Sequence, residues 1–347
     1  MTVVPLTSGI DSLYWSCAPG VSDERFSRFL AAREHAAEQP TVIEHDGFSL
    51  VVESHGSGMY PVLLTGAEFS VQLTDSERIP TAFVQLRAEF IHEVGPERAY
   101  AASRAVVEVI LERGAGPARA SRLDVYGDFG GWTLSDVDRR GIVTKAKLFP
   151  VLRAGTDEYE TVRVGVSPMV LRLYRKDIEV RARGGFADRF WDGYGGPVVR
   201  VEAQAGGAKL RELGIATVED ALASYGLLWS FATTRFCVLC EPDEGPRSSW
   251  RVSGKWMAVW ALGAFRFPQS ELVPVVKAER EQERVARQLL GSLASYAAFE
   301  SVFDGETAVE RLRARYPRYV VGERDSFAAK VVRRYSRLSR AVREGIV

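Results

Sequence analysis

A single tyrosine near the middle of the chain lies between two basic residues at alternate positions, in the run MVLRLYRK. In a β-strand successive side chains point to opposite faces, so Arg172, Tyr174 and Lys176 would share one face. The other face would hold the apolar residues Met169, Leu171 and Leu173. Flanking cations favour the phenolate and offset the charge of a phosphate under attack. The pattern is suited to transfer of a phosphodiester to the tyrosine, which keeps the bond energy in a covalent protein–DNA link.

Acidic residues occupy the corresponding positions of other predicted strands. Asp124 and Asp128 alternate with apolar residues in SRLDVYGDF, and Glu202 does so in PVVRVEAQ. Carboxylates from separate strands are suited to hold a divalent cation such as magnesium or manganese. On one regular strand Asp124 and Asp128 would lie about 13 Å apart, too far to share an ion unless Gly127 marks a bulge. We therefore expect Asp124 and Glu202 to be the main metal ligands, followed by Asp128 and then by Glu89 of the predicted strand 81–91.

Basic residues on the same faces and in the tail are candidates for contacts with DNA. Arg122 and Arg200 share the outward faces of the two acidic strands. From residue 311 to residue 343 there are eleven Arg or Lys residues and two acids, within a chain of zero formal net charge. Because clustered cations bind phosphates, we predict DNA contacts by Arg333, Arg334 and Arg337.

Each of these features also has a simpler interpretation. A polar sheet face is ordinarily the solvated side of an antiparallel sheet, and a half-exposed strand tyrosine with basic neighbours needs no catalytic role. The basic tail could likewise be a solvated helix surface. Cys237 and Cys240 have the spacing of a zinc site, but no second pair of ligands follows, so we predict that they are core residues.

The elements that must position these residues indicate an α+β fold. Along the first 240 residues the patterns predict strands, a helix beginning at Pro96, the strand 121–129, a short helix near 135–140 and further strands. This order favours an antiparallel sheet with helices on one face.

The rest of the chain is predicted to be mainly helical. The run EPDEGPRSS, which follows Cys240, is the best candidate linker, because proline, glycine and serine favour turns. We therefore expect a catalytic domain at residues 1–240 and a helical basic domain at residues 241–347 that binds DNA or a partner.

Composition and motifs exclude several classes of protein. No run of about 18 apolar residues occurs, which argues against a membrane span. Three cysteines in 347 residues argue against a disulfide framework and favour the reducing cytoplasm. The chain has no P-loop sequence, so strand separation driven by ATP would require a host helicase.

Three segments together resemble one protein family. GVSPMVLRLYRK is followed by RVEAQ and preceded by RLDVYGD, and the resemblance extends to GIDSLYW near the start and covers most of residues 8–214. In this order they resemble the replication initiation factor family, which comprises rolling-circle plasmid initiators and related relaxases of conjugative elements. The resemblance implies a Rep-type, HUH-like nuclease domain. Members often carry Asp directly after the tyrosine, where this chain has Arg175.

The resemblance also implies roles for individual residues. Tyr174 would be the nucleophile, Arg172 and Lys176 its flanking bases, and Asp124 and Glu202 the metal-binding acids. Such a protein nicks one strand at a replication or transfer origin, forms a 5′-phosphotyrosine and frees a 3′-hydroxyl. A second subunit in a homodimer could complete strand transfer.

Two other functions remain open. One is a protein that keeps the fold and binds origin DNA without cutting it. The other is a tyrosine recombinase, which would need a helical catalytic domain and an H-x-x-R element that this chain lacks.

Overall fold

The computed structural model describes residues 3–18, 21–36, 39–112, 116–152, 159–182, 191–267 and 278–315. The chain divides into two compact units, residues 1–272 and 273–347. The boundary therefore lies later than the predicted one at 240/241. The segment after residue 240 belongs to the first unit because its helix α9 (Gly254–Arg266) buries Trp256, Val259 and Leu262 in the core of that unit.

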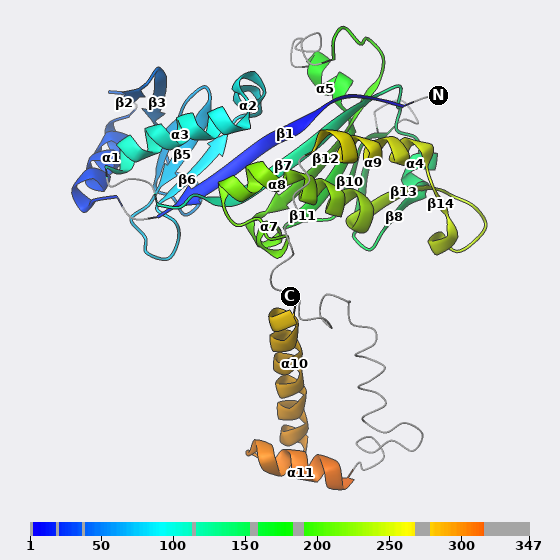
Figure 1. Cartoon of the computed structure of the whole chain (residues 1–347). Helices are drawn as coiled ribbons and strands as arrows, with labels where there is room; N and C mark the ends of the chain where they lie inside the picture. Colours follow the sequence, from blue (N-terminus) through cyan, green and yellow to red (C-terminus); the bar gives the residue numbers. More distant parts are fainter. Residues whose placement is uncertain are drawn as a thin grey trace. The chain divides into compact units, whose positions relative to one another are not determined.

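In the described residues, one antiparallel sheet of eleven strands dominates the first unit (Figure 1). The strand order across it is β2-β3-β4-β5-β6-β1-β7-β12-β11-β10-β9. The strands are β1 (Val4–Cys17), β2 (Val42–His45), β3 (Phe48–Val52), β4 (Val62–Thr65), β5 (Phe69–Leu73), β6 (Ala82–Leu86), β7 (Arg119–Gly130), β9 (Leu148–Leu152), β10 (Tyr159–Val164), β11 (Met169–Arg175) and β12 (Val198–Gly206). The predicted antiparallel sheet is thus present, with the tyrosine strand β11 beside β12 and β12 beside β7.

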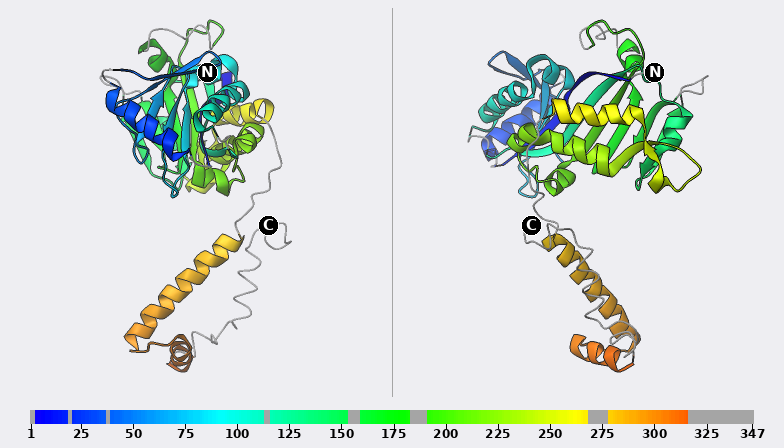
Figure 2. Two further views of the ribbon diagram at one scale, coloured as in Figure 1. Left: turned by 90° about the vertical axis from the view of Figure 1, so that its left-hand side faces the viewer. Right: turned by 45° about the vertical axis from the view of Figure 1, so that its right-hand side comes forward.

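Helices α8 and α9 cover one face of this sheet (Figure 2), whereas α2 and α5 border the cavity on the other face. The helices of the first unit are α1 (Asp23–His35), α2 (Ala88–Val94), α3 (Pro96–Leu111), α4 (Asp136–Gly141), α5 (Lys176–Ala182), α7 (Gly207–Glu212), α8 (Val218–Phe231) and α9. Strand residues facing α8 and α9 are apolar and fully buried, including Leu123, Leu171 and Val201. The predicted inward faces of β7, β11 and β12 therefore form the core.

Gly127 is required by the close approach of the helix layer. A Cβ atom at this position would lie 2.4 Å from Leu262 and 3.1 Å from Trp229, which belong to α9 and α8. The residue does not mark a bulge, because the pairing of β7 with β12 runs without a shift from Asp128 through Gly127 to Tyr126. Asp124 and Asp128 consequently lie four residues apart on a regular strand.

Turn and helix-capping residues lie at the ends of several strands and helices, as the sequence predicted. Asp46 and Gly47, with φ of 49° and 82°, form the two-residue turn between β2 and β3, because such turns need positive φ at both positions. Ser22 caps α1, and Thr217 forms a capping box with Asp220 at the start of α8.

Cys237 and Cys240 lie on β13 (Cys237–Glu241), in a small sheet ordered β14-β13-β8 with β14 (Arg251–Val252) and β8 (Ile142–Thr144). Both thiols are buried and free, and burial raises the pKa of each. The predicted core role is confirmed.

The second unit contains α10 (Ala278–Phe299) and α11 (Gly305–Arg315) in its described part. Arg333, Arg334 and Arg337 lie outside the described residues. Within the residues described, no helix is both long and apolar enough to cross a membrane.

Candidate functional site

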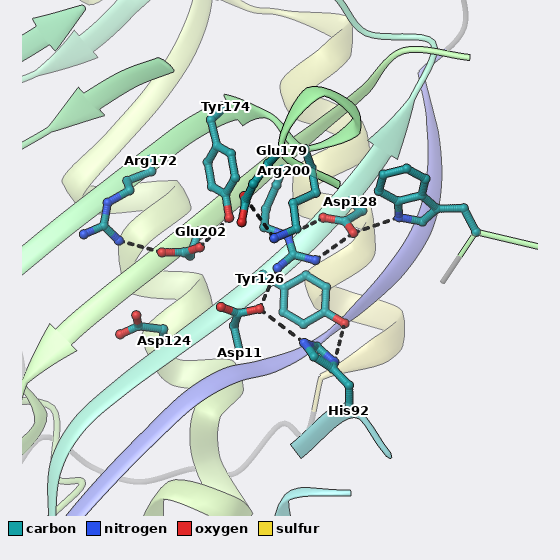
Figure 3. Close-up of polar contacts among 12 residues, drawn as sticks. Asp11, His92, Asp124, Tyr126, Asp128, Arg172, Tyr174, Glu179, Arg200 and Glu202 are labelled. Carbon is teal, nitrogen blue, oxygen red and sulfur yellow. Dashed lines mark hydrogen bonds and ion pairs between the residues drawn. The ribbon is translucent and has the colours of Figure 1, made fainter. Parts of the chain in front are cut away.

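The polar face of the sheet carries side chains in rows, because residues paired across antiparallel strands point to the same side. One row runs Thr161, Tyr174, Arg200, Asp128 and Thr7, from β10 to β1. The adjacent row runs Arg163, Arg172, Glu202, Tyr126 and Gly9. Tyr174 and Glu202 therefore lie on the same side of the sheet, opposite the helix layer (Figure 3).

Tyr174 is partly buried and is held by an acid of the next strand. Its hydroxyl donates to Glu202 Oε2 at 2.8 Å. Glu202 accepts a second bond, at 2.6 Å, from Nη1 of Arg172, whose Nη2 donates to Gln204 at 2.6 Å. The arrangement joins the predicted nucleophile directly to a predicted acid and a predicted base.

The pKa of the Tyr174 phenol is raised, in the opposite direction to that expected from flanking cations. Burial is the main cause, and the charges of Glu202 and Asp11 add to it, while Arg200 opposes the shift. A phenol that donates to a carboxylate is stabilised in its neutral form. Tyr174 is therefore a neutral hydrogen-bond donor in this arrangement and requires a base to become a nucleophile.

Arg200 and Asp128 form a buried ion pair beneath this site. Arg200 is 3% exposed and Asp128 is fully buried. Arg200 donates from Nε and Nη2 to the two oxygens of Asp128 at 2.6 and 2.9 Å, and Trp191 Nε1 donates to Asp128 at 2.9 Å. The guanidinium lies 3.8 Å from the ring centroid of Tyr126. Both oxygens of Asp128 therefore accept hydrogen bonds from the protein itself. This structural role does not favour the predicted metal ligation.

Asp11 is a site residue that strand alternation did not find. It lies at a shift in the pairing of β1 with β7, where Ile10 pairs with Val125 and Ser12 pairs with Asp124, so Asp11 is the extra residue of a bulge. A bulge re-aims side chains, and Asp11 accepts from Arg200 Nη1 at 2.6 Å. The segment GIDSLYW contains this residue and was the available signal.

His92 of α2 completes this side of the site. Its Nε2 lies 3.2 Å from Asp11 Oδ1, and its Nδ1 lies 3.4 Å from the hydroxyl of Tyr126 (Figure 3). Burial opposes ionisation of Asp11, but the hydrogen bond with His92 and the charge of Arg200 hold the pKa of Asp11 well below its usual range. The sequence pattern gave no reason to connect His92 with Asp11, since they lie 81 residues apart.

Asp124 is paired with Arg122 on its own strand. Arg122 donates from Nε to Asp124 at 2.9 Å and also from Nη2, and its guanidinium lies 4.9 Å from the ring centroid of Tyr14. Burial raises the pKa of Asp124 to about 6, and the nearby charge of Glu202 contributes, against the effect of Arg122. Asp124 and Glu202 are thus close enough to interact electrostatically.

The fit of these carboxylates to a divalent ion is limited. Among the described residues, no group of three or more His, Cys, Asp or Glu side chains is placed to hold a metal ion. Magnesium, however, is commonly held by one or two carboxylates together with water and substrate phosphates. Asp124 and Glu202 line one cavity, but Asp124 accepts two bonds from Arg122, and Glu202 accepts bonds from Arg172 and Tyr174. An ion held by these two acids would have to replace some of those bonds. Glu89 does not lie on a strand as predicted but on α2, because β6 ends at Leu86.

A cavity of about 1030 Å³ opens over these side chains. Tyr174, Glu202, Arg172 and Asp124 all line it, as does Lys176. Lys176 is the first residue of α5 rather than part of the strand, and it pairs with Glu179 at 3.1 Å. The predicted catalytic residues therefore line one cavity, and Asp11 and His92 line it too.

Comparison with known proteins finds similarity only among solved structures. No protein-family model and no curated protein matches the chain. Among solved structures, the rolling circle replication initiator protein from Geobacillus stearothermophilus is similar, with 13% identity and a TM-score of 0.45 over 76% of this chain and 100% of that chain. A likeness of this size carries no argument about the function of the present chain.

Proposed function

We propose that this protein cuts one strand of DNA and becomes joined to it through Tyr174, as a rolling-circle replication initiator or relaxase does. The observation that supports the proposal is the 2.8 Å hydrogen bond from the Tyr174 hydroxyl to Glu202 inside a large polar cavity. A tyrosine linked to a base in a cavity that also contains several arginines is the arrangement that covalent phosphoryl transfer needs.

Glu202 is the group placed to accept the phenol proton. As the proton moves to Glu202 Oε2, the tyrosine oxygen forms a bond to phosphorus and the bond from phosphorus to the 3′ oxygen breaks. The 3′ oxygen leaves with the bonding electrons and takes up a proton from water in the cavity. The products are a 5′-phosphotyrosine and a free 3′-hydroxyl.

The surrounding cations would stabilise charge on the phosphate. Arg172 is bonded to Glu202, and Arg200 pairs with Tyr174 across the strands. Arg200 has five N–H groups and donates two of them to Asp128 and one to Asp11, so it retains donors for a phosphate oxygen. A magnesium or manganese ion held by Asp124 and Glu202 would supply further polarisation of the phosphoryl oxygens when bound.

The decisive experiment measures covalent attachment. Supercoiled DNA that carries the replication or transfer origin is incubated with the protein and magnesium or manganese, and the products are separated under denaturing conditions. Wild type should give open-circular DNA and a protein–DNA adduct, and a chelator should prevent both. Tyr174→Phe should bind DNA but form no adduct.

Tyr14→Phe is the matched control, because Tyr14 lies on the same sheet face and keeps its ring in the variant. It should form the adduct as wild type does. An adduct formed by Tyr174→Phe would remove Tyr174 from the mechanism. Binding by wild type without any cutting would instead favour a non-catalytic DNA-binding protein.

A further inference from the structure

The row of side chains that contains Arg172 continues to the edge of the sheet. Arg172 pairs with Arg163 on β10, and Arg163 pairs with Phe149 on β9. Paired residues point to the same side, so all three lie on the polar face. Arg163 and Phe149 thus extend the candidate site beyond the cavity, whose nearest lining residues are Thr161 and Arg172.

The pairing of two arginines is electrostatically unfavourable in the protein alone. Like charges directly opposite one another on neighbouring strands destabilise a sheet. The charge of Arg172 is balanced by Glu202 at 2.6 Å. In the part of the chain that the structure describes, the buried Nε of Arg163 has no hydrogen-bond partner. Although this nitrogen is shielded, Arg163 as a residue is only partly buried. The rest of its guanidinium, next to a second cation, is suited to an anion that the protein does not itself provide.

An exposed aromatic ring lies beside this donor. Phe149 is 41% exposed, and the guanidinium of Arg163 lies 5.7 Å from its ring centroid. Proteins that bind single-stranded nucleic acid combine cations that contact the backbone with aromatic rings on which bases stack. Arg163 and Phe149 provide one group of each kind at adjacent positions.

We propose that Arg163 and Phe149 bind an unpaired nucleotide next to the scissile phosphate, with Arg163 contacting its phosphate and Phe149 stacking on its base. Arg163 lies one strand across and two residues along from Tyr174, which corresponds to about 8 Å between the two positions. This separation is comparable with that of neighbouring phosphates in an extended strand. The inference rests on the proposed function, because Tyr174 defines where the scissile phosphate lies.

The test measures binding of a fluorescent oligothymidylate by anisotropy at increasing sodium chloride concentrations. All proteins carry Tyr174→Phe, so that binding is measured without cutting. Loss of one phosphate contact lowers the slope of log K against log salt by about 0.7 for single strands, and Arg163→Gln should show this change. Loss of one stacked base weakens binding by about fivefold to 150-fold, and Phe149→Ala should show a loss in this range without a change in slope.

Matched controls come from surfaces remote from the polar face. Arg28→Gln removes a 71% exposed arginine from α1, and Met257→Ala removes a 54% exposed apolar side chain from α9. Neither should change the affinity or the slope. Arg163→Lys keeps a charge and should keep the slope. Arg163→Gln should unfold at a temperature no lower than the Tyr174→Phe parent, because it removes one of two arginines that pair directly across the strands.

The possible results separate the two proposals. If the Tyr174→Phe parent binds the oligonucleotide and both Arg163→Gln and Phe149→Ala match their controls, the nucleotide site is refuted while attachment through Tyr174 stands. If Phe149→Ala weakens binding to a duplex as much as binding to a single strand, the assignment of an unpaired base is refuted. If the Tyr174→Phe protein binds no single-stranded DNA, both proposals fail.

Discussion

Replacement of Asp128 by Ala should lower the stability of the first unit strongly, whether or not a metal ion is present. Asp128 is fully buried and accepts two bonds from Arg200 and one from Trp191. Its removal leaves a guanidinium that is 3% exposed with Asp11 as its remaining described ion-pair partner. Breaking a buried ion pair from one side costs about 3–5 kcal/mol, because the other charge stays buried.

The loss is measurable as a shift in unfolding. A cost of about 3–5 kcal/mol lowers the melting temperature of a unit of this size by about 6–20 °C. Urea titration followed by tryptophan fluorescence gives the free energy directly. Asp136→Ala is the control, because Asp136 is a half-exposed aspartate on α4 that pairs with Arg139 and Arg140, and such surface pairs contribute about 0–1 kcal/mol.

The same measurement distinguishes a structural role from metal binding. If Asp128 were a metal ligand, a chelator would destabilise wild type and leave the variant unchanged, and the difference between the two would vanish without metal. A loss below about 0.5 kcal/mol would refute the buried ion pair. The double variant Asp128→Leu with Arg200→Met should lose less free energy of unfolding than the two single variants lose together. Each single variant leaves one buried charge without its partner, whereas the double variant removes both charges of the pair.

Two further predictions concern the acids of the cavity. Glu202→Gln removes the base that accepts the Tyr174 proton, so the rate of adduct formation should fall by about 10²–10⁴-fold while DNA affinity changes little, and an unchanged single-turnover rate would show that another group takes the proton. For Asp124, the pKa in the folded state is about 6 and the ordinary value is 3.8, so the folded protein binds this proton more tightly. Protonation of Asp124 therefore contributes most to the stability of the fold at low pH, and this contribution is lost as pH rises from about 4 to about 6. Urea titrations of wild type and Asp124→Asn over this range should show a smaller decrease for the variant, and parallel curves would contradict the raised pKa.

Much of the site was predictable from alternation alone. A strand with apolar residues at every second position must turn that set toward the core, so the remaining side chains share the opposite face. Alternation correctly placed Tyr174, Glu202 and Asp124 on the polar faces of their strands. The predicted antiparallel sheet, with α8 and α9 on its apolar face, follows from the same patterns.

Other features depended on contacts between distant segments. The order of strands puts β12 between β7 and β11, and this order alone brings Glu202 beside Tyr174. Asp11 enters the site through a bulge, which breaks the period of two, and β6 ends before Glu89. The helix α9 joins the first unit because it packs close to Gly127, which the linker-like run after Cys240 did not indicate.

The amino-acid sequence by itself determined which side chains of each strand would share the apolar face and which would share the polar face, because that depends only on the two-residue repeat of an extended chain. The tertiary structure alone decided how the charges pair. Asp128 became the buried partner of Arg200, Glu202 became the acceptor for Tyr174, and Arg163 was left facing Arg172. These pairings depend on strand order and register, which are set by packing across the whole sheet and not by any local run of residues.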